Sequence, residues 1–309
     1  MRLTSKQEGH LIMLAVMSVF GLNIPINKYL YSSGLLSPMA VTCLRMTFAT
    51  IAFWLVSLFM PKEKVERKDM LILLVGGLCG MLMNQGLFAY GLGKTSPVDA
   101  SIITTSGPLF AMVIAAIVLK EPITLQKIGG VIIGGMGAVV LVYSSVQVVN
   151  QAPNAVGNLS ILCAQCFYAT YLVITRPLSA KYSSITMMKW MFLFSALFIL
   201  PISYQDVLNA HIFKQSDVTP YFLIAFTLLG ATFFTYMMIP HAQKRIRPTT
   251  ISMYNNMQPL IASVVAICMG MDKFTVEKLV AGILIFGGVY LVTQSKSRLD
   301  IERSTDLEK

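Results

Sequence analysis

Charged residues are scarce in this chain of 309 residues: Asp, Glu, Lys and Arg together make up 12% of the sequence. That share is about half of what soluble proteins contain. Hydrophobic residues, by contrast, make up 55%. A soluble domain has too small an interior to bury so many apolar side chains, so the composition excludes an ordinary soluble protein and indicates an integral membrane protein.

Acidic residues are missing from the interior of every long apolar run. The three histidines, His10, His211 and His241, lie near run ends or in a connecting segment. Ser, Thr and Tyr remain as nucleophiles, but no base accompanies them. The chain is therefore predicted not to be an enzyme, and the prediction includes no cofactor and no metal site.

Paired cysteines are nearly absent as well. All five cysteines fall inside apolar runs, and only Cys163 and Cys166 have the spacing of a redox or zinc pair. Neither a second pair nor a nearby histidine accompanies them. Small buried packing residues are the preferred interpretation, and no disulfide framework is predicted.

Basic residues exceed acidic ones, which gives a net charge of +10. They form short clusters between apolar runs, as the positive-inside rule expects of a membrane protein. Nucleic acid is therefore not a predicted partner. The predicted partners are a small-molecule substrate and the lipid bilayer, and assembly into a homodimer stays an open alternative.

Ten apolar runs have the length of a membrane-spanning helix, about 20 residues. The connecting segments are too short for a soluble domain. The runs lie within residues 10–31, 38–60, 70–92, 98–119, 125–145, 156–176, 184–204, 221–241, 249–270 and 275–295.

Lys and Arg predict the orientation of these runs. The two termini and the segments that share their side contain 17 basic residues, whereas the opposite side contains four. Positive charge marks the cytoplasmic side. Both termini, including a tail over residues 297–309, are thus predicted to lie in the cytoplasm, with the chain in the cell membrane.

The chain also repeats itself. "TTSGPLFAMVIAAIVLKEPITLQK", from Thr104, resembles "NNMQPLIASVVAICMGMDKFTVEK", from Asn255, 151 residues further on. Each half contains five runs, an odd number, so the second half must enter the membrane upside down. The predicted fold class is all-α integral membrane, with ten transmembrane helices as two inverted five-helix repeats over residues 8–146 and 155–296. Such symmetry suits a carrier with two states of similar energy.

Two longer stretches carry a family resemblance. "SPVDASIITTSGPLFAMVIAAIVLKEPITLQKIGGVIIGGMGAVVLV" (Ser96–Val142) and "RPTTISMYNNMQPLIASVVAICMGMDKFTVEKLVAGILIFGGVYLV" (Arg247–Val292) resemble the EamA family of the drug/metabolite transporter superfamily. The resemblance covers about residues 8–296. It implies ten helices in two bundles, and export or exchange of small polar metabolites such as amino acids. Gln258 departs from the family pattern, which often has an acidic residue before the proline.

Polar residues inside the apolar runs are the candidates for a substrate cavity, because each needs a partner or a wet surface at membrane depth. The wider set includes Gln85 and Gln165. A polar pair one turn before a proline in both halves is the preferred cavity wall. The substrate-binding candidates are Asn23, Asn27, Arg45, Asn84, Thr104, Thr105, Tyr168, Tyr236, Asn255, Asn256 and Gln258.

Three features of the candidate region allow two interpretations each. Pro108 and Pro259 are predicted to lie inside helices and to kink them, either at the substrate path or only for packing. Arg45 lies two turns into the second run, where a charge is costly. It either anchors to carbonyls or lipid phosphate, or binds an anionic group of the substrate.

The sequence therefore predicts a multi-pass transporter of amino-acid-like zwitterions or anions, working as an exporter, facilitator or exchanger by alternating access. An exchanger of phosphorylated sugars or nucleotide-sugars is the first alternative, and it would need several Lys and Arg at the cavity centre. A proton-coupled drug efflux carrier is the second. It would need a titratable group at membrane depth, which the apolar runs lack.

Overall fold

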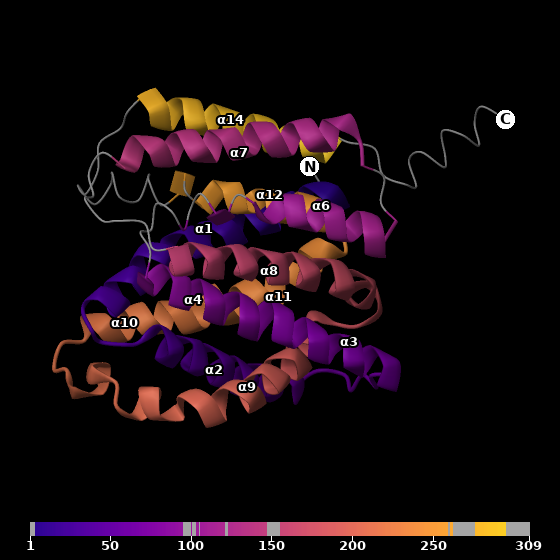
Figure 1. Cartoon of the computed structure of the whole chain (residues 1–309). Coiled ribbons are helices and arrows are strands. Elements are labelled where there is room, and N and C mark those ends of the chain that lie inside the picture. Colours follow the sequence, from indigo (N-terminus) through magenta and orange to yellow (C-terminus); the bar gives the residue numbers. More distant parts are fainter. Residues whose placement is uncertain are drawn as a thin grey trace.

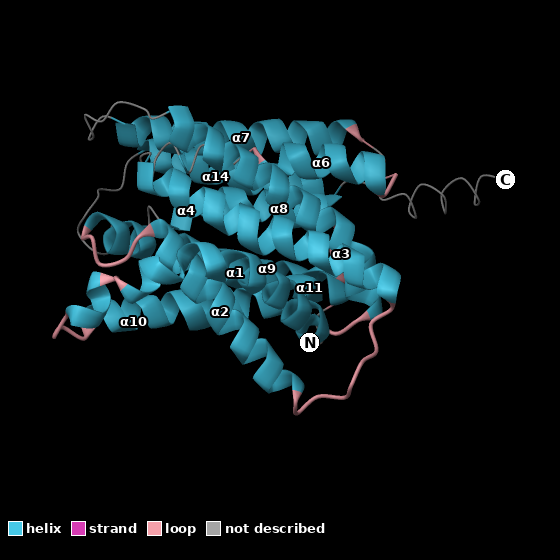
Figure 2. Cartoon of the chain, turned by 60° about the horizontal axis from the view of Figure 1, so that its bottom comes forward, coloured by secondary structure: helices cyan, strands magenta, loops and turns pink. Residues whose placement is uncertain are grey.

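The structure, a computed structural model, describes residues 4–94, 100, 103–104, 106–120, 123–146, 155–258, 260–261 and 276–294. Every regular element within these residues is a helix (Figures 1 and 2). Six helical stretches are long and apolar enough to cross a membrane: Ser5–Ser32, Pro38–Ser57, Arg67–Lys94, Leu159–Lys181, Ser184–Lys214 and Thr219–Gln243. The helical membrane class is confirmed, and the arrangement as ten helices in two inverted repeats stays a prediction.

Among the described residues, the first half of the chain contributes five helical regions. The third is one continuous rod with a π-helical segment, η1, in its middle. The elements are α1 (Ser5–Ser32), α2 (Pro38–Ser57), α3 (Arg67–Gly77), η1 (Leu78–Met83), α4 (Asn84–Lys94), α6 (Gly107–Val118) and α7 (Leu125–Val146).

The second half follows the same plan. Its third region is again a continuous rod with a π-helical segment, η3. The elements are α8 (Ala155–Lys181), α9 (Ser184–Leu208), the 3-10 turn η2 (His211–Lys214), α10 (Thr219–Ala225), η3 (Phe226–Phe234), α11 (Thr235–Gln243), α12 (Pro248–Met253), the 3-10 turn η4 (Tyr254–Asn256) and α14 (Val276–Gln294).

Local sequence explains where several helices begin and end. Ser37 caps α2 by accepting from the backbone N–H of Ala40, and Pro38 occupies the first turn, where its missing N–H costs nothing. Ser183 caps α9 in the same way through Thr186. Between α1 and α2 the chain turns at Gly34, whose positive φ of 68° favours glycine.

Aromatic residues and glycines pack different parts of the bundle. Phe53 of α2 stacks on Phe192 of α9 with ring centroids 5.6 Å apart. At the opposite edge of the molecule, α7 and α14 lie side by side (Figure 1). A Cβ built on Gly288 would lie 2.5 Å from the backbone nitrogen of Gly134, so only glycine permits this approach.

The two π-helical segments occupy equivalent places in the sequence. A shift of 151 residues, which relates the two similar stretches, places η1 on residues 229–234, inside η3. π-Helical turns are rare and often border functional sites. Each segment contacts a residue that lines the cavity described below.

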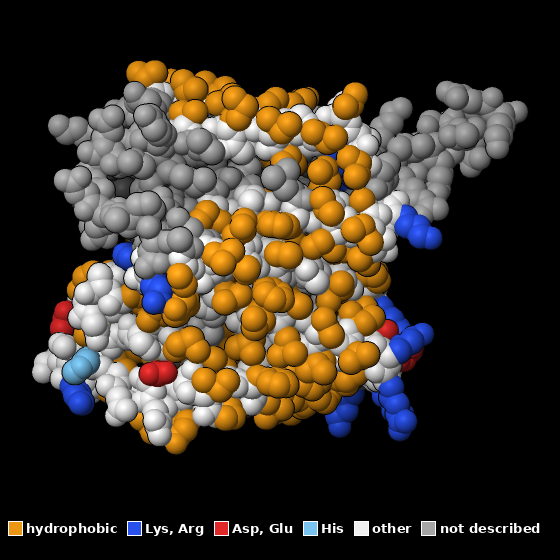
Figure 3. Space-filling view, in the orientation of Figure 1, with side chains coloured by type: hydrophobic (Ala, Val, Ile, Leu, Met, Phe, Trp, Pro, Cys, Tyr) orange, Lys and Arg blue, Asp and Glu red, His pale blue; other side chains and the backbone are white. Residues whose placement is uncertain are grey.

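The surface agrees with a lipid environment. Hydrophobic side chains cover the flank of the helices, and charged side chains gather toward the two ends of the bundle (Figure 3). Large apolar residues such as Leu55, Ile117 and Leu197 are more than half exposed. In water such a surface would drive aggregation, but lipid tails solvate it.

Candidate functional site: a polar cavity inside the helix bundle

One polar cavity lies between α1, α2, α4, α8, α11 and η4. The volume of this cavity that is open to the centres of water molecules is about 80 Å³. One water needs about 10–15 Å³ on this measure, so the space fits several waters or one small solute. The lining residues are Phe20, Asn23, Ile24, Asn27, Tyr31, Arg45, Asn84, Gln85, Phe88, Ala89, Thr104, Gln165, Tyr168, Tyr236, Asn255 and Gln258.

Helix α1 supplies one wall. Its lining residues recur three or four positions apart, which is the spacing of one helix face. The hydroxyl of Thr227, in η3, lies 2.8 Å from Asn23 Oδ1 and 3.1 Å from Asn27 Oδ1. A hydroxyl has one proton, so Thr227 donates to one of these two oxygens at a time, and each amide keeps an NH2 group and further acceptor capacity.

Arg45 is the charged residue of the lining. Its Nε donates to Thr232 Oγ1 at 2.7 Å, and its Nη2 donates to the carbonyl of Ala231 at 2.8 Å. Thr232 in turn donates to the carbonyl of Thr227 at 2.8 Å. The guanidinium is 8% exposed and is fixed to η3. A guanidinium has five N–H donors, so three remain for a bound group.

Two neighbours on α4 behave differently. Asn84 donates from Nδ2 to the carbonyl of Ala164 at 2.9 Å, which leaves its Oδ1 as an acceptor. Gln85 is 5% exposed; its amide interacts with the Tyr236 hydroxyl but makes no hydrogen bond of good geometry among the described residues. The hydroxyl of Tyr168 on α8 is buried and unpartnered within the described part. Unpaired buried polar groups are costly, and polar groups that line a cavity often bind solute there.

The π-helical segments hold two lining residues through equivalent carbonyls. Tyr236 donates to the carbonyl of Gly80 in η1 at 3.3 Å, and Arg45 donates to the carbonyl of Ala231 in η3. Gly80 and Ala231 are 151 residues apart, the spacing of the sequence repeat. Each half of the chain thus offers a carbonyl at the same place to a cavity side chain.

The amides at the other wall form a short chain. Asn255 donates from Nδ2 to Gln165 Oε1 at 3.4 Å, and Gln258 donates from Nε2 to Asn255 Oδ1 at 3.4 Å. Both distances are long for N–H···O bonds. The three amides are therefore weakly held and can exchange these contacts for contacts with a solute.

Most of the residues expected from sequence surround this cavity. Nine of the eleven candidates line it: Asn23, Asn27, Arg45, Asn84, Thr104, Tyr168, Tyr236, Asn255 and Gln258. Asn256 does not, because its amide lies against α7, where a Cβ on Gly134 would come within 2.8 Å of Nδ2. Thr105 and Pro259 lie outside the described residues.

Pro108 has a different place from the one expected. It lies in the first turn of α6, which begins at Gly107, rather than inside a continuous helix. The backbone turns at Ser106 and starts a new helix there, so the missing N–H of the proline costs no hydrogen bond. Thr104, which lines the cavity, lies two residues before Ser106.

Sequence reasoning left several lining residues out of the candidate set. Gln85 and Gln165 belonged only to the wider polar set, although Gln85 lies 151 residues before Tyr236 and is its repeat equivalent. Phe20, Tyr31 and Phe88 were missed because aromatic residues in an apolar run resemble packing residues. Spacing could have revealed two of them, since Tyr31 follows Asn27, and Phe88 follows Asn84, by one helical turn.

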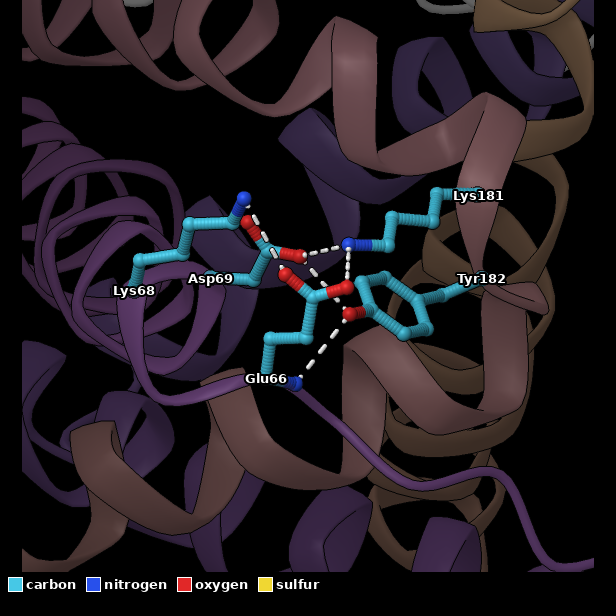
Figure 4. Close-up of polar contacts among 5 residues, drawn as sticks. All are labelled: Glu66, Lys68, Asp69, Lys181 and Tyr182. Atoms are coloured by element: carbon cyan, nitrogen blue, oxygen red, sulfur yellow. Dashed lines mark hydrogen bonds and ion pairs between the residues drawn. The ribbon is translucent and has the colours of Figure 1, made fainter.

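A polar cluster joins α3 and α8 at the end of the bundle where α3 begins (Figure 4). Asp69 accepts from Lys181 Nζ and from the Tyr182 hydroxyl, both at 2.7 Å. The backbone N–H of Glu66 donates to Tyr182 Oη at 3.2 Å. Hydrogen bonds from Lys181 and then Lys68 lower the pKa of the Glu66 carboxyl below its ordinary 4.5.

A neighbouring carboxylate extends this cluster to α9. Ser183 donates its backbone N–H and its hydroxyl to Glu63 at 3.0 and 2.9 Å. Burial raises the pKa of the Glu63 carboxyl, but hydrogen bonds from Thr186 and Ser183 outweigh it, and the net pKa is lowered. The loop before α3 is thereby fastened to the α8–α9 junction.

Fold and cavity together define a helical membrane protein with a donor-rich polar chamber inside the bundle. A family model described as "EamA-like transporter family" matches residues 7–143 and again residues 155–294. The chain therefore belongs to the EamA-like transporter family of membrane transporters.

Relatives with curated names are transporters too. An uncharacterized transporter, YyaM, of Bacillus subtilis is 22% identical over 90% of this chain and 91% of its own. A WAT1-related protein of Arabidopsis thaliana is 25% identical over 93% and 86%. A probable terminal-alkyne amino-acid exporter of Streptantibioticus cattleyicolor is 24% identical over 81% and 82%.

A solved crystal structure shares the fold. It superposes with a TM-score of 0.72 at 16% identity, over 93% of this chain and 98% of that chain. The family description and the names of the Bacillus subtilis and Streptantibioticus cattleyicolor relatives describe transporters.

Proposed function

We propose that this chain transports small polar metabolites of the amino-acid class, zwitterions or anions, as an exporter, a facilitator or an exchanger. The observation that carries the proposal is the cavity, in which Arg45 and a set of amides face the same space as Phe20 and Phe88. A guanidinium and amides suit a carboxylate, and the rings suit an apolar substituent. The similar Streptantibioticus cattleyicolor protein, named as a probable amino-acid exporter, supports the same class.

The proposed mechanism is alternating access between two inverted five-helix repeats, residues 8–146 and 155–296. Two observations support it. The π-helical segments η1 and η3 lie at equivalent positions of the two halves, and the family model matches each half separately. Inverted halves can exchange conformations around a fixed central site, which gives two states of similar energy.

Facilitation or exchange is favoured over proton coupling. The cavity lining that the structure describes contains no Asp, Glu or His. A proton-coupled carrier needs such a titratable group at membrane depth. Uptake should therefore depend only weakly on an imposed pH gradient, and accumulation that follows the gradient and collapses with a protonophore would contradict this mechanism.

The chemistry of the cavity gives less support to the alternatives. Phosphorylated sugars and nucleotide-sugars carry two or more negative charges, whereas Arg45 is the one ionised side chain among the described lining residues. Efflux of lipophilic cations needs an acidic partner, and the described lining contains none.

Counterflow in proteoliposomes tests the proposal. Vesicles with the purified full-length chain are loaded with unlabelled amino acids, sugars or sugar phosphates, and entry of labelled solute is followed against protein-free vesicles. We expect counterflow for amino acids or their anionic derivatives, and none for sugar phosphates. Counterflow of sugar phosphates alone would overturn the proposal.

A further inference from the structure

We propose that the cavity selects solutes that carry a carboxylate but no free ammonium group, such as N-acyl amino acids and 2-oxo acids, over zwitterionic amino acids. The inference rests on the proposed transport function and specifies the solute class within it. Four properties of the lining support it: its net charge, its surplus of donors, the fixed guanidinium and the apolar side.

The charge of the lining matches a monoanion. Among the sixteen described lining residues, Arg45 is ionised, and no Asp, Glu, Lys or His accompanies it. A monocarboxylate neutralises this charge. A zwitterion would also bring an ammonium group out of water to a place without a carboxylate partner, which is unfavourable.

Hydrogen-bond donors exceed acceptors in the same lining. Three N–H groups of Arg45 remain after its contacts with Thr232 and Ala231. The single proton of the Thr227 hydroxyl engages the Oδ1 of Asn23 or of Asn27, so these two amides remain both donors and acceptors. The lining amides donate and accept alike, and Asn84 Oδ1 and Gln85 Oε1 are acceptors that an ammonium group can use. The surplus of donors therefore comes from Arg45, and it favours a carboxylate, which only accepts.

Gln85 gives an independent sign that a ligand belongs here. Gln85 is 95% buried and lines the cavity, and beyond its interaction with the Tyr236 hydroxyl its amide makes no hydrogen bond of good geometry among the described residues. An amide can donate to a carboxylate or pair with the acyl amide of an N-acyl amino acid. An ammonium group satisfies only the amide oxygen.

The guanidinium is already placed for such a contact. Thr232 and Ala231 hold its Nε and Nη2, and Thr232 is itself bonded to the backbone of η3. A carboxylate can therefore bind without reordering the arginine. Phe20, Ile24 and Phe88 supply an apolar side for the substituent of the solute.

Binding and counterflow with matched solutes test this selectivity. Three series are used, built on alanine, leucine and phenylalanine. Each contains the amino acid, its N-acetyl derivative, its 2-oxo acid and the decarboxylated amine. In at least one series, we expect wild-type protein to bind the N-acetyl and oxo acids about tenfold or more tightly than the amino acid, and to exchange them in preference to it. We expect neither binding nor exchange of the amine.

Variants then identify the group responsible. In Arg45→Gln the preference for the anion over the zwitterion should fall about tenfold or more, and Arg45→Lys should restore it in part. Lys189→Gln is the matched control, because Lys189 lies over the ring of Trp54, outside the cavity lining. The ratio of two solutes within one preparation is independent of the fraction of folded protein, so partial misfolding does not obscure the result.

Equal affinity for zwitterion and anion in the wild type would overturn the inference while leaving the transport proposal intact. So would an anion preference that Arg45→Gln leaves unchanged. Failure of every member of all three series to bind or exchange would overturn the proposed function itself. Thr232→Val provides a further check, since it keeps the charge but removes the partner of Nε and should weaken the preference.

Discussion

At the scale of single residues, two neighbouring amides have different surroundings. Asn255 lines the cavity and contacts Gln165 and Gln258. Asn256 is fully buried against α7, and neither atom of its amide has a partner among the described residues. One step of about 120° along a 3-10 turn is enough to point adjacent side chains at different neighbours.

Asn255→Ala and Asn256→Ala form a matched pair of variants. Removing a solute contact from a desolvated site costs about 1–3 kcal/mol, so Asn255→Ala should raise the KM for counterflow roughly five- to a hundredfold. Asn256→Ala should leave KM unchanged and should not lower thermal stability, because a buried unpaired amide is unfavourable. If Asn256→Ala loses affinity for the solute while its thermal stability stays normal, then Asn256 contacts the solute and the assignment to Asn255 alone is wrong.

Glu66 predicts a dependence of stability on pH. Its carboxyl has a lower pKa in the folded protein than the ordinary 4.5, because it accepts hydrogen bonds from Lys181 and Lys68. The ionised form therefore stabilises the folded state at neutral pH. This contribution is lost as the pH falls from about 4.5 through the folded-state pKa.

The measurement is the thermal midpoint of wild-type protein and of Glu66→Gln between pH 7 and pH 3. The wild type should be the more stable at pH 7, and the difference should shrink as the solution is acidified below pH 4.5. A difference that stays constant or grows on acidification would mean that the ionised carboxyl does not stabilise the fold.

At the scale of elements, the third and eighth predicted runs share an irregular backbone. Each is an α-helix with a π-helical segment in its middle, and the segments are related by the 151-residue shift. In η1 the neighbouring helix α8 comes so close that a Cβ on Gly80 would lie 2.4 Å from Tyr171 Cγ. The same glycine presents its carbonyl to Tyr236.

Gly80→Ala should therefore force η1 and α8 apart. Overpacking of this kind costs about 1–3 kcal/mol, and we expect a lower thermal midpoint in detergent. Gly129→Ala, in α7, is the control: no atom lies within 4 Å of the added Cβ, and Ala favours a helix over Gly by roughly 0.5–1 kcal/mol. If both variants have the stability of the wild type, the close contact at η1 does not constrain the bundle.

At the scale of the whole molecule, the polar ends of the bundle should mark the two faces of the membrane. Glu8 pairs with Arg245 at 3.0 Å. At the α8–α9 junction, Glu63 contacts Ser183 and Glu66 contacts Tyr182. His241 contacts Ser184 at the same junction. Asp217 lies in the loop before α10, at the opposite end of the rod that α10, η3 and α11 form. Basic residues gather at the first of these ends.

Single cysteines in a cysteine-free background test the orientation. Lys64→Cys, Arg245→Cys and Lys296→Cys should react with an impermeant maleimide only from the cytoplasmic side. Gln151→Cys and Asp217→Cys should react only from outside. Labelling of the Gln151 and Arg245 variants from one and the same side would rule out the inverted arrangement of the two halves.

The membrane class, most of the described helix boundaries and the family could be predicted from the amino-acid sequence, because each depends on local composition and spacing. The run predicted at 38–60 is the helix Pro38–Ser57, and the run at 221–241 is the rod from Thr219 to Gln243. Polar residues in apolar runs were equally visible, since any amide at membrane depth needs a partner.

Which of those polar residues line one cavity depends on the packing of helices that are far apart in the sequence. Asn255 and Asn256 are indistinguishable in sequence, yet one lines the cavity and the other packs against α7. Arg45 finds Thr232 and Ala231 nearly 190 residues away, and a π-helical turn presents that carbonyl. Contacts between distant helices depend on their rotation and crossing, which periodicity along one helix does not encode.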